Sequence, residues 1–232
     1  MAGAYSASWD PPAKARLSEL ELDVVRPYVP TGGAPAVLDV GCGNGRVLAA
    51  VLAAGGPGLR AFGIDVAEEM VAVCRERFRG ESRVAGLAVC DVAADRVPFD
   101  EGFALITALR VLKYSENWRA VVTSLVSLLD SDGVLVCSMP NRNSLNRLSR
   151  PYAVPWYSAT PSELSRALAD AGARVIEMRG FARLPYVLYR RLTGPRTSAA
   201  VTAAEQLLAA GLGPQMLARE LFVVGRRDAG AD

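Results

Sequence analysis

Histidine is absent from the sequence of 232 residues. This absence excludes the Ser-His-Asp and Cys-His nucleophile systems, metal sites with histidine ligands, and histidine as a general base. Any chemistry that this chain carries out must therefore proceed without an imidazole group.

Net charge and long apolar runs are also scarce. The formal net charge is only +2, whereas nucleic-acid and membrane-surface binders usually carry a strongly basic face. No apolar run approaches the roughly 18 to 20 residues that a membrane helix needs, and residues 1–10 lack the basic-then-apolar pattern of a secretory signal. We therefore expect a cytoplasmic protein without stable membrane insertion and without a nucleic-acid partner.

Cysteine is scarce, and its spacing does not suit a metal site. The four cysteines Cys42, Cys74, Cys90 and Cys137 show no Cys-x-x-Cys spacing, so neither a zinc site nor a disulfide framework is predicted. They are expected to be small buried apolar residues. With 51% apolar and 22% charged residues, residues 1–232 have the composition of a single domain.

Short apolar segments alternate with segments of helical periodicity along most of the chain. Strands are expected at residues 37–40, 59–64, 84–90, 103–108, 134–139, 174–180 and 220–225. Helices are expected at residues 47–54, 67–79, 116–129 and 160–171, with a turn at residues 130–133. The last of these helices is expected to have Thr160 as its N-cap, Pro161 at its first position and the acid Glu163 in its first turn. Strands joined by helices pair in parallel through right-handed crossovers. The pattern predicts an α/β fold with one Rossmann-like, seven-stranded, mostly parallel sheet and helices on both faces.

Two segments interrupt this alternation, and both are predicted to cover a substrate. Residues 141–158 contain Tyr152, Trp156 and Tyr157, which either line an acceptor pocket or pack a lid onto the domain. Residues 181–219 carry an arginine-rich stretch, which either recognises an anionic acceptor or forms a solvated basic face.

A glycine-rich turn follows the first expected strand. Gly41, Gly43 and Gly45 form a Gly-x-Gly-x-Gly pattern, which lets the backbone approach a ligand closely at the positive end of the next helix. Arg46 stands where the dinucleotide fingerprint requires glycine, and no Gly-Lys-Ser/Thr sequence follows. NAD, FAD and a Walker phosphate loop are therefore disfavoured.

Acidic residues stand at the ends of the second and third expected strands. Asp65 lies about twenty residues beyond Gly45, a spacing at which an acid can accept both hydrogens of a ribose diol. Asp91 lies at the same edge of a parallel sheet, where such sheets bind ligands. Taken singly, Asp65 is alternatively a helix N-cap and Asp91 a loop residue. Together they favour a nucleoside-containing cofactor.

Three successive segments, residues 37–45, 63–70 and 90–92, resemble the motifs of a known family. They read Val-Leu-Asp-Val-Gly-Cys-Gly-Asn-Gly, Gly-Ile-Asp-Val-Ala-Glu-Glu-Met and Cys-Asp-Val, and they are similar to motifs of the class I S-adenosylmethionine (SAM)-dependent methyltransferases. Residues 103–114 and 128–141 resemble the fourth and fifth strands of that family. The resemblance covers most of the chain, in the family's order and spacing.

The resemblance implies a set of SAM-binding residues: Asp39, Gly41, Gly43, Gly45, Asp65, Val66, Asp91, Val92 and Leu109. At the methionine end of SAM, the three glycines would shape the turn. Asp39 would lie behind the amino group, and Leu109 would lie near the sulfonium.

At the nucleoside end of SAM, the resemblance implies contacts to the sugar and to the base. Asp65 would hold the ribose hydroxyls, and Val66 would pack on the adenine. Asp91 and Val92 would meet the amino edge of the adenine.

The sequence departs from the family pattern at two places. Ala104 replaces an acid that commonly follows the phenylalanine, and Lys113-Tyr114 stand where many relatives have a histidine pair. The second departure leaves the identity of a catalytic base open, with Tyr114 and Glu116 as candidates for a phenol or hydroxyl acceptor. Alternatively, Tyr114 is a buried, hydrogen-bonded tyrosine at the strand end. The acceptor-binding residues are expected to be Tyr114, Tyr152, Trp156 and Tyr157.

The sequence thus predicts an enzyme that transfers a methyl group from SAM to an oxygen or nitrogen of a small-molecule acceptor, such as a secondary metabolite, without a metal. The Pro-Cys and Asn/Asp-Pro-Pro-aromatic motifs of nucleic-acid methyltransferases are missing. Two alternatives stay open, namely a lipid or quinone methyltransferase and a non-catalytic partner subunit with the SAM fold. The oligomeric state is open as well, with a homodimer as one option.

Overall fold

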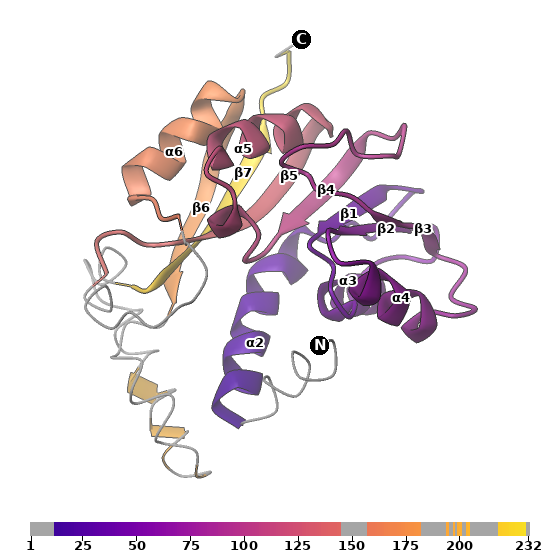
Figure 1. Cartoon of the computed structure of the whole chain (residues 1–232), viewed down its shortest axis with the longest axis horizontal. Coiled ribbons are helices and arrows are strands. Elements are labelled where there is room, and N and C mark those ends of the chain that lie inside the picture. The colour runs from indigo at the N-terminus through magenta and orange to yellow at the C-terminus, as the bar shows by residue number, and fades with distance from the viewer. Residues whose placement is uncertain are drawn as a thin grey trace.

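The computed structural model describes residues 12–144, 157–181 and 218–230, together with positions 194, 197, 199–200 and 203–204. Its centre is one sheet of seven strands in the order β3-β2-β1-β4-β5-β7-β6 (Figure 1). The strands are β1 (Ala36–Val40), β2 (Arg60–Asp65), β3 (Val84–Val89), β4 (Phe103–Ala108), β5 (Leu129–Pro140), β6 (Ala173–Phe181) and β7 (Glu220–Arg227). The α-helices are α2 (Pro12–Val25), α3 (Arg46–Ala54), α4 (Glu68–Arg77), α5 (Trp118–Ser127) and α6 (Pro161–Asp170), and the 3-10 helices are η1 (Arg26–Tyr28) and η2 (Leu112–Tyr114).

The strand directions confirm the predicted fold class. β1 pairs in parallel with β2 and β4, β2 pairs in parallel with β3, and β4 pairs in parallel with β5. β7 runs antiparallel to both of its neighbours and separates β5 from β6. Four of these six pairings are parallel, and all seven predicted strands are present.

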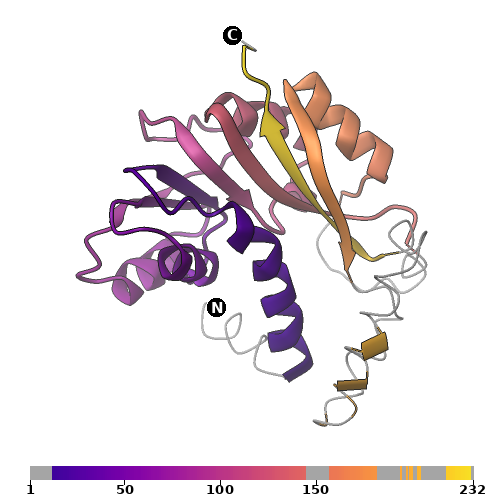
Figure 2. The same cartoon turned by 180° about the vertical axis from the view of Figure 1, so that it is seen from behind.

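Helices cover both faces of the sheet. α2, α3 and α4 lie on one face, and α5 and α6 lie on the other (Figures 1 and 2). Side chains of a strand alternate between the two faces, and the core is accordingly split into two apolar clusters. In β1, Leu38 packs in the cluster beneath α5 and α6, whereas Val37 packs in the cluster beneath α2 and α3. Burial on both sides explains why the central strands are apolar throughout.

One edge of the sheet gathers elements that are far apart in the sequence. Asp39 of β1 lies in register with Thr107 of β4, and both strands end at this edge. The segment after β4 reaches the turn after β1, because a Cβ atom on Gly41 would lie only 2.5 Å from Cγ2 of Val111. Glu220, the first residue of β7, pairs with the last residue of β5. The edge therefore brings β1, β4, β5 and β7 together.

Residues 130–133 do not form the separate turn that the sequence predicts. They belong to β5, where the pairing with β4 shifts register between Phe103 and Leu105. Asp132 has a φ of +64°. Turn-forming residues can be absorbed by a bulge when both flanks stay paired, and a local sequence pattern does not distinguish a bulge from a chain reversal.

The start of α6 follows the predicted capping pattern. The side-chain oxygen of Thr160 accepts a hydrogen bond of 3.2 Å from the backbone N–H of Glu163, whose carboxylate accepts one of 2.8 Å from the N–H of Thr160. This reciprocal arrangement satisfies two backbone donors at the start of the helix. The expected N-cap at Thr160 and proline at the first helical position are confirmed.

Other expectations have mixed outcomes. All four cysteines are free and buried, as predicted. Helix α2 was not predicted at all. Residues 145–156 and most of residues 182–217 lie outside the described part of the chain, so the two substrate-covering segments stay predictions. Within the described residues, no helix combines the length and apolar character that crossing a bilayer demands.

Candidate functional site

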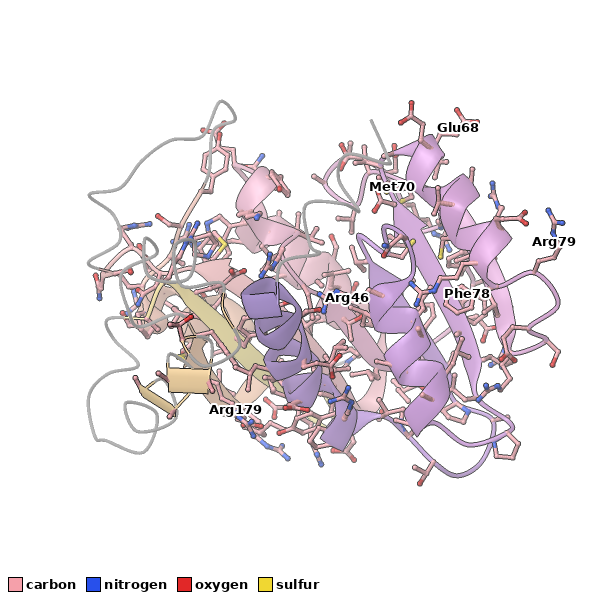
Figure 3. The ribbon with its side chains drawn as sticks, turned by 90° about the horizontal axis from the view of Figure 1, so that it is seen from below. Arg46, Glu68, Met70, Phe78, Arg79 and Arg179 are labelled. Atoms are coloured by element: carbon pink, nitrogen blue, oxygen red, sulfur yellow. The ribbon has the colours of Figure 1, made fainter. Side chains whose placement is uncertain are left out.

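The glycine turn between β1 and α3 has left-handed backbone at all three glycines. Gly41, Gly43 and Gly45 have φ values of +70°, +52° and +80°, a region that residues with a side chain rarely adopt. A Cβ atom on Gly45 would lie 2.4 Å from the ring of Phe78, which lies beside α3 at the end of α4 (Figure 3). A Cβ atom on Gly43 would meet only the carbonyl oxygen of Gly41, at 4.0 Å. The flanking glycines are therefore required by internal packing, whereas the middle one faces open space.

Asp65 ties this turn to the end of β2. One of its carboxylate oxygens accepts a hydrogen bond of 2.8 Å from the N–H of Gly43, and the other accepts one of 2.9 Å from the N–H of Ala67. Ala67 itself is the N-cap residue of α4, so the alternative that Asp65 caps this helix is wrong. A carboxylate offers about four acceptor positions. Asp65 therefore retains capacity for a ligand hydroxyl.

Asp39 is a carboxyl group buried beneath the turn. Its side chain is 1% exposed, and its Oδ1 accepts a hydrogen bond of 2.7 Å from the hydroxyl of Thr107. Its Oδ2 has no hydrogen-bond partner among the described residues. Burial raises the pKa of Asp39 to about 7, although Thr107 and the nearby Arg46 oppose the shift. A cation close to Oδ2 would satisfy this group and restore its charge.

The residues predicted to contact the nucleoside lie around the ends of β2 and β3. Val66 is 68% exposed, and large exposed apolar side chains at a sheet edge suit stacking against a ligand. Asp91 is exposed and accepts a hydrogen bond from the N–H of Ala93 within its loop, so the loop role considered for it is observed. Val92 is half-buried. Leu109, which follows β4, is buried in the cluster beneath α2 and α3. Their contacts with a ligand stay predictions.

A cluster of charged and polar side chains around the buried Glu21 lies next to the turn, and we call it the Glu21 cluster. It consists of Glu21, Arg46, Arg110, Ser138 and Glu220. The carboxylate of Glu21 in α2 binds Arg46 at 2.9 Å and also binds Arg110. Figure 3 shows Arg46 between α2 and α3. Glu21 therefore fastens α2 to the first residue of α3, directly after the glycine turn.

The same cluster continues from β4 to β7. The backbone N–H of Arg110 donates to the hydroxyl of Ser138 at 2.8 Å, and that hydroxyl donates to Glu220 at 2.9 Å. Arg110 has a φ of +64°, a strained conformation for a residue with a side chain. Such strain persists only where the surroundings hold the residue in place. Here Glu21 and Ser138 hold Arg110 at the edge of the sheet.

Lys113 is a buried cation beside the Glu21 cluster. It is 7% exposed, and its ammonium lies 4.9 Å from the ring centroid of Tyr114. Burial lowers its pKa to about 8, and Arg110 contributes to the shift, whereas Glu220 and Glu21 oppose it. A cation that can lose its proton near neutral pH therefore lies at the edge of the sheet.

The residues predicted to bind an acceptor are only partly described. Tyr114 is 56% exposed, so the alternative of a buried tyrosine is wrong. Tyr157 is half-buried against the cluster beneath α5 and α6, and its N–H donates to the carbonyl of Lys113 at 2.9 Å. Tyr152 and Trp156 lie outside the described residues. No group of His, Cys, Asp and Glu suited to a metal occurs in the described ranges.

The sequence predictions missed the Glu21 cluster. Its members come from five separate segments of the chain, and no local motif joins them. The apolar residues between Leu17 and Val25 are a signal for helix α2. They do not reveal that Glu21 faces the end of β4.

Comparison with known proteins relates part of the chain to a described family. A model described as a methyltransferase domain matches residues 38–135, a range that contains the glycine turn, Asp65 and Asp91 in order. Residues 38–135 thus match a methyltransferase-domain family, and the fold of the chain is that of solved SAM-dependent methyltransferases.

Curated relatives of this methyltransferase domain are named as enzymes of ubiquinone synthesis. One ubiquinone biosynthesis O-methyltransferase, from Glaesserella parasuis, is 31% identical over 114 residues, which are 47% of this chain and 46% of the relative. Another, from Dinoroseobacter shibae, is 27% identical over 160 residues, which are 62% of each chain. The chain thus spans between about half and three-fifths of the length of these relatives.

Solved structures share the fold of this methyltransferase domain. A protein in complex with the Trm112 methyltransferase activator of Haloferax volcanii has a TM-score of 0.66 at 20% identity, over 97% of this chain and 96% of its own. A SAM-dependent methyltransferase of Mesorhizobium loti has a TM-score of 0.62 at 17% identity, over 88% and 96%. Magnesium protoporphyrin IX methyltransferase of Synechocystis, solved with S-adenosylhomocysteine (SAH), has a TM-score of 0.59 at 16% identity. The match covers 93% of this chain and 85% of that protein's chain.

Proposed function

We propose that this domain binds SAM at the glycine turn and transfers its methyl group to a small-molecule acceptor. The observation that carries the proposal is the buried Oδ2 of Asp39, which has no partner among the described residues. A carboxyl group in that position is costly without a cation, and the amino group of SAM is a cation. The open space in front of Gly43 leaves room for the donor.

We call the residues proposed to hold SAM the donor side: Asp39, Gly41, Gly43, Gly45, Asp65, Val66, Asp91, Val92 and Leu109. Asp39 holds the amino group, and Asp65 holds the ribose hydroxyls with its remaining acceptor positions. The backbone of the glycine turn approaches the methionine part closely because Gly43 has no side chain. The nucleoside lies against exposed Val66 and beside Asp91 and Val92.

The reaction needs little more than good placement of the two reactants. The methyl group of SAM is bonded to a positively charged sulfur, which makes it electrophilic without help from the protein. An acceptor held in line with that bond gains much of the rate from orientation alone. The rigid edge formed by the ends of β1 and β4 places the acceptor, and the sequence supplies no histidine for proton transfer.

The Glu21 cluster and Lys113 form what we call the acceptor side. The charged members lie on α2, at the start of α3, on the segment after β4 and at the start of β7. An oxygen acceptor is favoured over nitrogen, because both curated relatives are named as O-methyltransferases. Their names also support a phenol of a quinone precursor as the second candidate acceptor.

Binding of SAM tests this proposal directly. Isothermal titration of the purified domain is expected to give micromolar-scale affinity for SAM and SAH. Asp65→Ala should weaken SAM binding at least tenfold because the ribose contact is lost. Asp100→Ala is the matched control, since Asp100 is exposed and pairs only with exposed Arg96 among the described residues. Folded wild-type protein that binds neither SAM nor SAH would overturn the proposal.

A second experiment, a methyl-transfer assay, separates the proposal from a non-catalytic partner subunit. Incubation with methyl-labelled SAM and a panel of phenols, catechols and quinone precursors should yield methylated product. A domain that binds SAM yet labels no acceptor in the panel would support the non-catalytic alternative.

A further inference from the structure

Lysine is almost absent from this chain. Of 26 basic residues only two, Lys14 and Lys113, are lysines, and all others are arginines. The guanidinium of arginine stays protonated in proteins, whereas the ammonium of a buried lysine can lose its proton. Nearly all positive charges of this chain are arginines, yet one of its two lysines, Lys113, is buried at the edge of the sheet.

Lys113 lies between the donor side and the predicted covering segment. Val111, two residues earlier, packs against the first glycine of the turn, because a Cβ atom on Gly41 would lie 2.5 Å from it. On the other side, the N–H of Tyr157 donates to the carbonyl of Lys113 at 2.9 Å. Tyr157 belongs to the segment predicted to cover the acceptor. The segment from Val111 to Lys113 therefore contacts the glycine turn on one side and Tyr157 on the other.

The surroundings of Lys113 are charged on several sides. Glu220 of β7 and Glu21 of α2 favour its protonated form, whereas Arg110 after β4 and Arg219 before β7 disfavour it. The ring of Tyr114 lies 4.9 Å from its ammonium. Burial is the largest influence, and the resulting pKa of about 8 gives both protonation states a sizeable population at physiological pH.

Other side chains near the acceptor side are less suited to removing a proton. Glu21 is engaged with Arg46 and Arg110, and Glu220 accepts a hydrogen bond from Ser138. Each carboxylate therefore already accepts at least one hydrogen bond from a neighbouring side chain. Tyr114 carries a phenol whose ordinary pKa is about 10, so it is largely protonated under the same conditions.

We infer that Lys113 is the catalytic base of this domain, and that it takes the proton which a hydroxyl acceptor loses on methylation. The inference rests on the proposed function. In the neutral form of Lys113, the lone pair on Nζ accepts the proton as the acceptor's O–H bond breaks. The acceptor oxygen forms its bond to the methyl carbon, and the electron pair of the breaking C–S bond stays on sulfur, giving SAH. The acceptor class is thus a phenol or other weakly acidic hydroxyl.

The protonation of Lys113 can be measured without turnover. Protein labelled with ¹³C and ¹⁵N only at lysine should give two side-chain NMR signals, because the chain has two lysines. One should titrate near pH 8 and disappear in Lys113→Arg, and the other should titrate at about 10.4, the ordinary value for lysine. Lys14→Arg, the same exchange in α2, assigns the second signal. A Lys113 signal that titrates above pH 10 in the SAH complex overturns the inference.

Activity toward two catechols then shows whether Lys113 acts as a base or only supplies a positive charge. Lys113→Arg keeps the charge but cannot accept a proton, so kcat/KM for catechol near pH 8 should fall about 100-fold or more. For 4-nitrocatechol, whose hydroxyl is already largely ionised at that pH, the loss should be under about tenfold. The wild-type rise of kcat/KM toward pH 8 should vanish in this variant. Lys14→Arg should match wild type with both catechols.

The outcomes distinguish this role from the proposed function. Equal losses with both catechols would mean that Lys113 only positions the acceptor, and the inference fails. Wild-type protein that binds SAM but methylates neither catechol overturns the proposed hydroxyl acceptor itself. If circular dichroism shows that Lys113→Arg does not fold, Lys113→Met replaces it. A loss of kcat/KM that is much larger for catechol than for 4-nitrocatechol then supports the inference, and equal losses overturn it.

Discussion

The donor side and the acceptor side of this domain are built in different ways. The donor side consists mainly of backbone N–H groups and of single carboxylates at strand ends, as in the hydrogen bond from the N–H of Gly43 to Asp65. On the acceptor side, buried and partly buried charged side chains from α2, from the start of α3, from the segment after β4 and from β7 hold one another, with Glu21 between Arg46 and Arg110. The first arrangement depends on glycines with positive φ, and the second depends on charge balance.

This difference teaches which part of such a domain can vary. Backbone contacts do not depend on side-chain identity except where a side chain would collide, so the donor side is expected to tolerate few changes at its glycines and its two carboxylates, Asp39 and Asp65, and more changes at its other positions. A cluster of buried charges can be rebuilt with other residues only if the charges still balance. Acceptor specificity is therefore expected to depend on coordinated changes at several positions.

The largest expected effect is a loss of stability from a substitution that disturbs the packing of the donor side. Gly45→Ala should lower the free energy of unfolding by about 2–4 kcal/mol, because a Cβ atom would lie 2.4 Å from the ring of Phe78 and φ is +80°. Gly43→Ala should cost only about 1 kcal/mol but weaken SAM binding at least tenfold, since the space in front of it is open. Urea unfolding and isothermal titration measure both quantities. Equal stability losses in the two variants would contradict this distinction.

Asp39 offers a test of the donor side through pH. Its folded pKa of about 7 lies above its unfolded value of about 3.9, so the folded state keeps a proton that the unfolded state releases between these values. The free energy of unfolding should therefore fall as pH rises, by about 2–3 kcal/mol between pH 5 and pH 8 from this group. Asp39→Asn should remove that part of the slope.

The binding of SAM should show the reverse trend. A cation at Oδ2 favours the charged carboxylate, so affinity for SAM is expected to increase as pH rises to about 7 and then to level off. Titration calorimetry at several pH values measures this. An Asp39→Asn variant with the same pH dependence as wild type, in either unfolding or binding, would disprove the role given to Asp39.

A smaller effect is expected on the acceptor side. Glu21→Gln leaves Arg46 and Arg110 near each other without their shared carboxylate, and should lower the free energy of unfolding by about 1–2 kcal/mol. The value is below that of a fully buried pair because the side chains of the two arginines are 30% and 25% exposed. Affinity for SAM should change less than twofold, whereas kcat/KM for a catechol should fall.

The control for this prediction is an exposed ion pair that belongs to neither the donor side nor the acceptor side. Asp100→Asn breaks the pair with Arg96, in which both side chains are more than four-fifths exposed, so stability should stay unchanged. A Glu21→Gln variant that is as stable as Asp100→Asn would show that the cluster contributes nothing to folding.

The sequence predicted the donor side better than the acceptor side for a physical reason. The turn at Gly41 to Gly45 can be predicted from the sequence because its backbone conformation requires glycine. The acid Asp65 can be predicted because it stands at the end of an apolar strand. The seven strands follow from apolar periodicity, and the N-cap at Thr160 follows from local hydrogen bonding. The role of these residues toward a ligand stays a prediction.

The parts that escaped prediction depend on contacts between distant segments. Glu21 and Glu220 come close to the segment after β4 only in the folded domain. No rule of sequence spacing predicts this proximity. Residues 130–133 were read as a turn because their composition is that of a turn, although pairing on both flanks keeps them in β5. Exposure of Tyr114 likewise depends on which segment packs beside it.

The placement of β7 has a consequence for synthesis on the ribosome. Because β7 lies between β5 and β6, β6 leaves the ribosome before the strand that joins it to the rest of the sheet. Strands β1 to β5 are contiguous in the sheet and can assemble first, and domains generally begin to fold during translation. The nascent chain would thus have its glycine turn in place well before Glu220 arrives.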